Sequence, residues 1–277
     1  MQKINYPLIV SDFDGTLVKR DGSIDEINKK AIAEYIAAGG KFAISTGRMP
    51  AGILSRAQEL GLKGMVCCCQ GSIIMDIESN EVILQGRIPM DTTIKICQKM
   101  EELGLHIHVY DLWEYYSNMD DDALKFYESA VKSKAKIIEN MPISEFVKEK
   151  GLSSYKVLAM VRAEDNERIM NRLSKEDFVG CELTKSADYL VEVINNNYSK
   201  GSAVEFLANY YNIPLEKTIA IGDQLNDLPM IEKAGLGVAV KNADERLKVK
   251  ANYISQKTNE EGAIGEIIEK FGFFKED

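Results

Sequence analysis

Long apolar runs are missing from this sequence of 277 residues. No stretch approaches the roughly 18 apolar residues that a membrane-spanning helix needs, so we expect no membrane partner. The first residues have neither the basic start nor the long apolar stretch of a signal peptide. We therefore expect a cytoplasmic protein.

Positive charge is also in short supply. Lys and Arg together number 34 against 43 Asp and Glu, which gives a formal net charge of -9. Sequence-independent binding to a polyanion requires clustered basic side chains that release counterions. Nucleic acid is thereby excluded as an expected partner, and nothing in the composition implies a protein partner.

Histidine and paired cysteine, the usual ligands of transition metals, are scarce. His106 and His108 alternate and would share one face of a strand, but no third ligand stands near them in the sequence. Cys67, Cys68 and Cys69 are adjacent, so on a strand they would point to opposite faces and could not close on one metal. Small apolar side chains in a buried strand are the simpler interpretation of these cysteines.

Uniformly apolar segments mark the strands that are present. Residues 8–10, 42–44 and 219–221 are typical of central parallel strands covered on both faces. A helix is predicted between the first two, with Ser23 and Glu26 at capping-box spacing and a Gly39-Gly40 stop. Strand, helix and strand in this order predict a right-handed parallel unit. Further helices are predicted over 51–60, 202–211, 228–234 and 263–271, so both ends of the chain indicate a doubly wound, mostly parallel α/β sheet.

The middle of the chain has a different pattern. Helical stretches alternate there with strands, and the aromatic content is higher. We predict one α/β core domain in two parts, 1–85 and 193–277, with an α+β domain inserted over 86–192. The expected helices of the insert are 92–103, 122–133, 143–149 and 166–173, and its expected strands are 106–110, 155–161 and 189–194.

Carboxylates follow two of the predicted core strands. Asp12 and Asp14 come after the first, and Asp223 and Asp227 come after the strand at 219–221. In a doubly wound sheet, ligands gather beyond the carboxyl ends of the strands. An Asp-Gly pair alone is an ordinary turn, but four converging carboxylates are untenable without a cation. Oxygen ligands with no Cys or His favour Mg²⁺.

Groups suited to an anion stand at the same edge of the predicted sheet. Thr46, with the backbone N–H groups of Gly47 and Arg48, follows the second strand, and Lys200 precedes a helix. Taken alone, Lys200 is typical of a solvated lysine and residues 46–48 of a strand-to-helix turn. Beside a Mg²⁺ site, they predict a cradle for a phosphate group.

Four segments together resemble the haloacid dehalogenase superfamily in order and spacing. They are Asp12-x-Asp14-Gly15-Thr16-Leu17, Ser45-Thr46-Gly47-Arg48, Lys200-Gly201 and Gly222-Asp223-x-x-Asn226-Asp227. More narrowly the chain resembles the Cof-type phosphatases, which carry a C2B cap between the second and third segments (subclass IIB). The resemblance covers about 170 core residues, while in the insert it depends on position and element order. Gln70-Gly71 replaces the Asn-Gly of many relatives, and Lys241 stands where they have Gly; Lys241 could meet an anionic group or simply face solvent.

The resemblance implies a Mg²⁺-dependent phosphatase that hydrolyses a small phosphorylated metabolite, a sugar phosphate or cofactor phosphate, through an aspartyl-phosphate. Asp12 would be the nucleophile and Asp14 the general acid and base. Asp12, the backbone carbonyl of Asp14 and Asp223 would hold the metal. Asn226 and Asp227 would orient these ligands, and the phosphate would be bound by Thr46, Gly47, Arg48 and Lys200.

Two other functions remain open from the sequence. A phosphohexomutase of the same superfamily would need a bisphosphate activator and several cap arginines; Arg162, Arg168 and Arg172 are present, the last two on a helix face predicted to be solvated. A regulator that binds a phosphorylated ligand without turnover is the alternative from another class.

Overall fold

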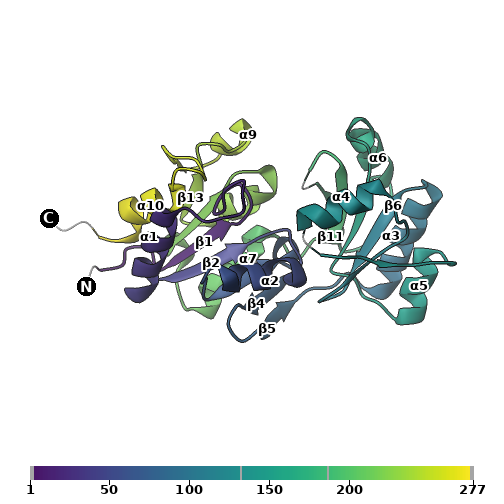
Figure 1. Cartoon of the computed structure of the whole chain (residues 1–277), viewed down its shortest axis with the longest axis horizontal. Helices are drawn as coiled ribbons and strands as arrows, with labels where there is room; N and C mark the ends of the chain where they lie inside the picture. Colours follow the sequence, from purple (N-terminus) through teal and green to yellow (C-terminus); the bar gives the residue numbers. More distant parts are fainter. Residues whose placement is uncertain (1–2, 132, 186, 275–277) are drawn as a thin grey trace. The chain divides into compact units, whose positions relative to one another are not determined.

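The computed structural model describes residues 3–131, 133–185 and 187–274. Figure 1 shows the chain coloured along its sequence. It divides into two compact units: the first comprises the chain up to Thr46, Arg56–Ile83 and the chain from Ser199 onward, and the second comprises Gly47–Ser55 and Leu84–Tyr198. The predicted domain boundaries and the role of the insert as a cap stay predictions.

The first unit is built around an eight-stranded sheet of order β14-β13-β12-β1-β2-β3-β4-β5. Its six strands from β14 to β3 are parallel, and β4 pairs antiparallel with β3. β5 leads from the first unit into the second. The strands are β1 Leu8–Asp12, β2 Lys41–Ser45, β3 Met65–Cys68, β4 Ile73–Asp76, β5 Val82–Gln85, β12 Thr218–Gly222, β13 Leu236–Ala239 and β14 Tyr253–Ile254.

β1 lies in the middle of the parallel strands, between β12 and β2, and all five of its residues are buried. The uniformly apolar segments at 8–10, 42–44 and 219–221 are therefore strands, as predicted. The connection from β1 runs toward β2, whereas the connection from β12 runs toward β13 in the opposite direction. In doubly wound sheets, ligands bind beyond the carboxyl ends of the strands where the strand order reverses, which here is the carboxyl end of β1.

Helices of the first unit cover this sheet. Right-handed crossovers that run in opposite directions put the helix after β1 and the helix after β12 on opposite faces, so the doubly wound prediction is confirmed. α1 packs against α10, and α7 packs against α8. The helices are α1 Glu26–Ala37, α7 Lys200–Tyr210, α8 Leu228–Lys233, α9 Glu245–Lys248 and α10 Ala263–Ile267; α2 Pro50–Glu59 spans the boundary between the units.

One predicted helix start was wrong. α1 is capped by Asp25, whose side chain accepts the N–H of Ile27 at 2.9 Å, and not by Ser23. The hydroxyl and N–H of Ser23 instead donate to Asp21 in the preceding turn. Asp and Ser both favour N-cap positions, so spacing alone did not distinguish them.

The second unit is an α+β unit with a six-stranded sheet of order β10-β11-β9-β6-β7-β8. Its strand pairs are antiparallel apart from β7 and β8. The strands are β6 His106–Tyr110, β7 Tyr115–Ser117, β8 Lys136–Ile137, β9 Lys156–Met160, β10 Cys181–Thr184 and β11 Leu190–Asn195, and the helices are α3 Met90–Glu102, α4 Asp122–Val131, α5 Ile143–Lys150 and α6 Asn166–Leu173. α4 is shorter than the predicted helix 122–133, of which residue 132 lies outside the described residues.

Side chains alternate between the two faces of this second sheet. Ile107, Val157 and Val191 belong to an apolar core that also includes residues of α3, α5 and α6. Their neighbours in sequence, His108, Lys156 and Glu192, are polar and also buried. The period of two therefore puts these three polar side chains on the opposite face of the sheet, here called the polar face, which they share with apolar residues such as Leu158 and Ile194.

His106 and His108 share the polar face, as predicted, with their ring centroids 4.9 Å apart. Burial lowers the pKa of both imidazoles, which favours their neutral forms. Within the described residues, neither histidine belongs to a group of three possible metal ligands. Cys67 and Cys68 lie in the buried strand β3, as expected, whereas Cys69, also buried, lies outside it and begins the 3-10 turn Cys69–Gly71. Burial raises the pKa of Cys67 to about 12.

In the described parts of the chain, no helix is both long and apolar enough to cross a bilayer.

Candidate active site

Asp12 is the last residue of β1 and lies at the carboxyl end of the sheet, where the strand order reverses. Its side chain is buried because β12 and β2 flank β1. Asp14 follows in an exposed turn and forms a β-bridge with Val18. The structure thus separates the two acids of this segment into one buried carboxylate and one at the surface.

Gly15 lets this turn approach the loop after β12. It has a φ of +80°, and a Cβ atom added there would lie 2.6 Å from Oδ2 of Asp223. Thr16, the next residue, donates its hydroxyl to Oδ1 of Asp223 at 2.8 Å. Both contacts hold Asp223 beside the end of β1.

Asp227 organises the loop that follows β12. Its Oδ2 accepts the backbone N–H groups of Asp223 at 2.9 Å and Gln224 at 3.0 Å. The side chain of Asp227 is buried, and the 3-10 turn Leu225–Asp227 leads directly into α8. Asn226, in the same turn, donates to the side chain of Gln70 at 3.3 Å.

Lys200 joins the two loops. Its Nζ atom lies 2.5 Å from Oδ1 of Asp12 and 2.6 Å from Oδ1 of Asp227, and its side chain is 1% exposed. Burial disfavours the ammonium, but the adjoining carboxylates outweigh it and raise the pKa of Lys200 above its usual value. Lys200 is the first residue of α7. A capping box between Ser199 and Ser202 stabilises the start of this helix, which lies two residues before the predicted start at residue 202.

Asp12, Asp223 and Asp227 form a group in which ligand atoms lie within 4.8 Å of one another, and all three are buried. Burial raises the pKa of Asp12, and burial together with the charge of Asp227 raises the pKa of Asp223 to about 6. One ammonium therefore faces three carboxylates, which leaves room for a divalent cation to balance their charge. An all-oxygen donor set suits a hard ion such as Mg²⁺.

Thr46 follows β2 at the same edge of the sheet, beside Ser45, whose register partner is Asp12. Its side chain is buried; its N–H donates to the carbonyl of Cys67 at 2.8 Å, and its carbonyl accepts the N–H of Gln70 at 3.1 Å. Gly47 and Arg48 are half-buried and belong to the second unit. α2 begins at Pro50, so two residues separate Gly47 from the helix.

Sequence reasoning did not assign roles to Thr16, Asn242 or Gln70. Asn242 donates to the carbonyl of Gly15 at 2.8 Å and so fastens the turn after β1. Thr16 stands inside one of the four segments that carried the family resemblance, which was a usable signal. The contacts of Gln70 depend on the left-handed backbone conformation of Cys69 and Gln70, which no sequence pattern predicted.

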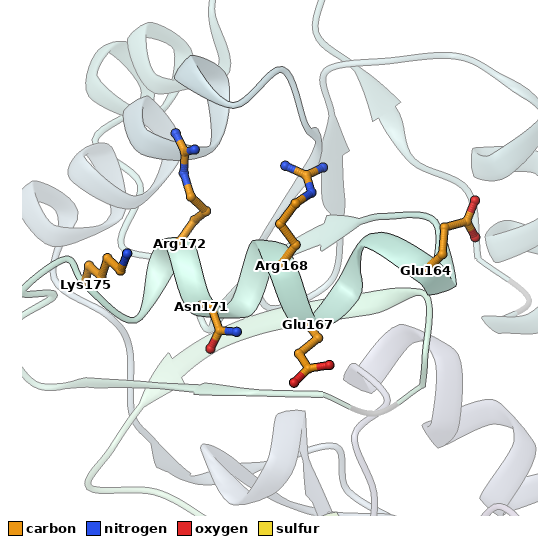
Figure 2. A pocket seen from close by; sticks show the side chains of 6 residues that line it. All are labelled: Glu164, Glu167, Arg168, Asn171, Arg172 and Lys175. Atoms are coloured by element: carbon orange, nitrogen blue, oxygen red, sulfur yellow. The ribbon is translucent and has the colours of Figure 1, made fainter.

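The arginines considered for a mutase lie on the second unit. Arg168 and Arg172 are exposed on α6, as predicted, and Arg168 pairs with Asp165 at 2.7 Å. Figure 2 shows both side chains rising from the same side of the helix. They line an open pocket together with Glu164, Glu167, Asn171 and Lys175.

Comparison with known proteins supports the family resemblance. The haloacid dehalogenase-like hydrolase family matches residues 9–268. A putative phosphatase of Haemophilus influenzae is 30% identical over 275 residues, which cover 96% of this chain and 98% of that protein. A putative phosphatase of Bacillus subtilis is 30% identical over 95% of this chain and 98% of its own length. A 5-amino-6-(5-phospho-D-ribitylamino)uracil phosphatase of the same organism is 28% identical over 94% of each chain.

Solved structures share the fold over nearly the whole chain. A haloacid dehalogenase-like hydrolase from B. subtilis superposes with a TM-score of 0.85 at 26% identity and covers 95% of this chain and 99% of its own. A sugar phosphatase of haloacid dehalogenase subclass IIB superposes with a TM-score of 0.82 at 22% identity, over 96% and 99% of the two chains. The chain belongs to the haloacid dehalogenase-like hydrolase family and is an enzyme of its phosphatase type.

Proposed function

We propose that this enzyme is a Mg²⁺-dependent phosphatase of small phosphorylated metabolites that works through an aspartyl-phosphate on Asp12. The observation that carries the proposal is the buried group of Asp12, Asp223 and Asp227 with Lys200 between two of them. Such a cluster concentrates negative charge, a nucleophile and one fixed ammonium at the carboxyl end of a central strand.

Asp12, Asp223 and the backbone carbonyl of Asp14 would hold the metal ion. When bound, Mg²⁺ supplies positive charge that lowers the repulsion between the nucleophile and an anionic phosphate. Asp227 accepts two backbone N–H groups and the ammonium of Lys200, so it would keep Asp223 and Lys200 in place. Asn226 would support the same loop through its bond to Gln70.

In the first chemical step a carboxylate oxygen of Asp12 forms a bond to phosphorus while the bond from phosphorus to the leaving oxygen breaks. Asp14 gives its proton to the leaving oxygen as that bond breaks. In the second step Asp14 takes a proton from a water molecule, whose oxygen attacks phosphorus. Inorganic phosphate then leaves and the carboxylate of Asp12 is restored.

Lys200 and Thr46 would donate to the phosphoryl oxygens, where fixed positive charge is most effective. Gly47 and Arg48 would add backbone N–H donors from the segment that follows Thr46. The second unit would act as a cap that limits access of water and contacts the leaving group.

For the substrate we propose a phosphorylated sugar, polyol or cofactor. Support comes from the relative named for 5-amino-6-(5-phospho-D-ribitylamino)uracil, which carries a phosphorylated ribityl chain. A panel for screening should therefore contain this compound, hexose and pentose phosphates, pyridoxal phosphate and flavin mononucleotide.

The test measures phosphate release over this panel with Mg²⁺ and with a chelator, for the wild type and for Asp12→Asn. We expect Mg²⁺-dependent release that Asp12→Asn abolishes, and an acid-stable protein-bound phosphate in the wild type alone. Asp21→Asn, at an exposed acid of the first unit, is the matched control and should keep full activity. Turnover that survives Asp12→Asn would refute the mechanism, and isomerisation of a hexose phosphate without phosphate release would indicate a mutase.

A further inference from the structure

Gln70 is buried close to the candidate active site with only half of its side-chain amide hydrogen-bonded. The residue is 4% exposed, and its Oε1 atom accepts the amide of Asn226 at 3.3 Å. Its Nε2 atom is buried and has no hydrogen-bond partner among the residues that the structure describes. A buried donor without an acceptor is rare in native proteins and requires an explanation.

The backbone around Gln70 is held in an unfavourable conformation. Cys69 and Gln70 have φ angles of 49° and 59°, in the left-handed region that residues other than glycine seldom adopt. Gly71 continues this conformation with a φ of +95°. Backbone strain of this kind persists where surrounding structure enforces it, and it is concentrated at functional sites.

Three segments of the candidate site enforce this conformation. The N–H of Gln70 donates to the carbonyl of Thr46 at 3.1 Å, and the side chain of Gln70 receives the hydrogen bond from Asn226. Gly71 packs so closely on the carbonyl of Ser199 that a Cβ atom there would overlap it, and Ser199 caps the helix that begins with Lys200. Gln70 therefore lies where the loops that carry Thr46, Asn226 and Lys200 meet.

We propose that Gln70 is a further phosphate-binding residue, whose Nε2 donates a hydrogen bond to a non-bridging oxygen of the transferred phosphoryl group. The inference depends on the proposed function, because the acceptor is the phosphate of the substrate. Asn226 occupies Oε1 and so fixes which end of the amide remains available. A phosphoryl oxygen is a strong acceptor, and a neutral amide donor can bind it without adding charge to a site that already contains Lys200.

A purely structural role makes a different prediction. If Gln70 only connects Asn226 to Thr46, then its whole contribution comes from the hydrogen bonds of its Oε1 atom and its backbone N–H. A variant that keeps both of these groups and loses Nε2 would then bind phosphate normally. Gln70→Glu keeps both groups at the same size and still offers an oxygen to Asn226, but its new negative charge would repel phosphate by itself, so Gln70→Met, which lacks Nε2 and adds no charge, is measured beside it.

The experiment measures the inhibition constants of inorganic phosphate and orthovanadate against hydrolysis of p-nitrophenyl phosphate, and the direct binding of phosphate by calorimetry in the presence of Mg²⁺. For Gln70→Glu we expect both ligands to bind about 10- to 100-fold more weakly than to the wild type. Gln58→Glu makes the same chemical change at an exposed position of α2, where the amide donates to the carbonyl of Ile77, and should bind phosphate within about twofold of the wild type.

Unchanged phosphate and vanadate binding in Gln70→Glu would overturn the inference. Gln70→Met is held to the same criterion: unchanged binding in it would overturn the inference even if Gln70→Glu binds more weakly, and it stands alone if thermal unfolding shows that Gln70→Glu does not fold. Calorimetry needs no turnover, so it measures the effect of Gln70 on phosphate binding even if the enzyme hydrolyses none of the esters. A wild type that binds phosphate but hydrolyses no ester would refute the proposed function only. A wild type that binds no phosphate would refute both the proposed function and the role of Gln70.

Discussion

The Nζ atom of Lys200 lies 2.5 Å from Oδ1 of Asp12, although the two residues are 188 positions apart in the sequence. Both side chains are buried, and Lys200 contacts Asp227 as well. A buried ammonium between two carboxylates stabilises the fold only as a set, because removal of one member leaves uncompensated buried charge. The proposed catalytic site is therefore also a determinant of the stability of the first unit.

Replacement of Lys200 tests this double role. We expect Lys200→Met to lower the free energy of unfolding by about 3 to 5 kcal/mol, because two buried carboxylates lose their shared cation. We also expect kcat to fall at least about 100-fold, because a fixed charge beside the phosphoryl oxygens is lost. Chemical denaturation and phosphate release measure the two effects.

Lys233→Met is the matched control for this variant. Lys233 pairs with Glu205 at 3.1 Å, but both side chains are more than 40% exposed, so we expect a change within about 1 kcal/mol and normal kcat. A Lys200→Met enzyme that is destabilised but fully active would show that Lys200 serves the fold alone.

Mg²⁺ binding should depend on pH because metal and protons compete for the same carboxylates. Burial, together with the charge of Asp227, raises the pKa of Asp223 to about 6, and burial raises the pKa of Asp12 too. Below about pH 6 we expect the apparent Mg²⁺ affinity to fall about tenfold per pH unit for each proton displaced. Calorimetry between pH 5 and 8 measures this; an affinity that is constant over that range would contradict it.

The same shifts determine how stability without metal varies with pH. Between about pH 4 and pH 6 the folded protein binds more protons at Asp223 than the unfolded chain does, so the contribution of Asp223 to stability falls as the pH rises through this window. The gain in melting temperature on addition of Mg²⁺ should therefore be larger at pH 7 than at pH 5. Asp223→Asn should reduce this difference, since the amide does not titrate and one proposed ligand of the metal is lost, while Asp12 still titrates.

The residue types of the candidate site could be predicted from the sequence because strand ends of a parallel sheet meet at one edge. The structure brings together Asp12, Asp223, Asp227 and Lys200, and their catalytic roles stay predictions. What the sequence did not indicate is which charges pair. The ion pairs of Lys200 depend on α7 beginning at residue 200, and the apolar pattern of that helix becomes visible only after Ser202.

The fold, too, could be predicted only where the sequence carries a local pattern. The strands β1 and β12 were predicted because burial on both faces favours the uninterrupted apolar stretches 8–10 and 219–221 within them. Short elements such as β8 and β14, with two residues each, have no periodicity to detect. The left-handed residues at Cys69 and Gln70 are set by tertiary contacts and therefore left no local signal.

Gly15 provides a test of the close approach between the turn after β1 and the loop after β12. In Gly15→Ala the added Cβ atom would lie 2.6 Å from Oδ2 of Asp223, at a backbone position with a φ of +80°. We expect displacement of Asp223, at least about tenfold weaker Mg²⁺ binding and a corresponding loss of kcat. Mg²⁺ titration and steady-state kinetics measure the two effects.

Gly39→Ala separates backbone strain from that collision. Gly39 has a φ of +102° and nothing within 4 Å of an added Cβ atom. It should cost about 1 to 2 kcal/mol of stability and leave Mg²⁺ binding unchanged. Equal effects of the two substitutions on Mg²⁺ binding would mean that the contact between Gly15 and Asp223 does not matter.

Lys156 and Glu192 form a buried ion pair on the polar face of the second sheet. Nζ and Oε1 are 2.8 Å apart, and the side chains are 4% and 1% exposed. Because each single substitution leaves one buried charge without its partner, Lys156→Met and Glu192→Leu should each lower the free energy of unfolding by about 3 to 5 kcal/mol. The double variant should lose clearly less than the sum of the two, since no buried charge remains.

Denaturation followed by the fluorescence of Trp113 reports on this pair, because Trp113 is the single tryptophan and lies in the second unit. The exposed pair Lys185 and Asp188 serves as the control: its atoms are 3.3 Å apart, and its side chains are 50% and 82% exposed. A double-mutant cycle there should give a coupling below about 1 kcal/mol. If the cycle at Lys156 and Glu192 gave a coupling as small as this, the buried pair would not be a structural determinant of the second sheet.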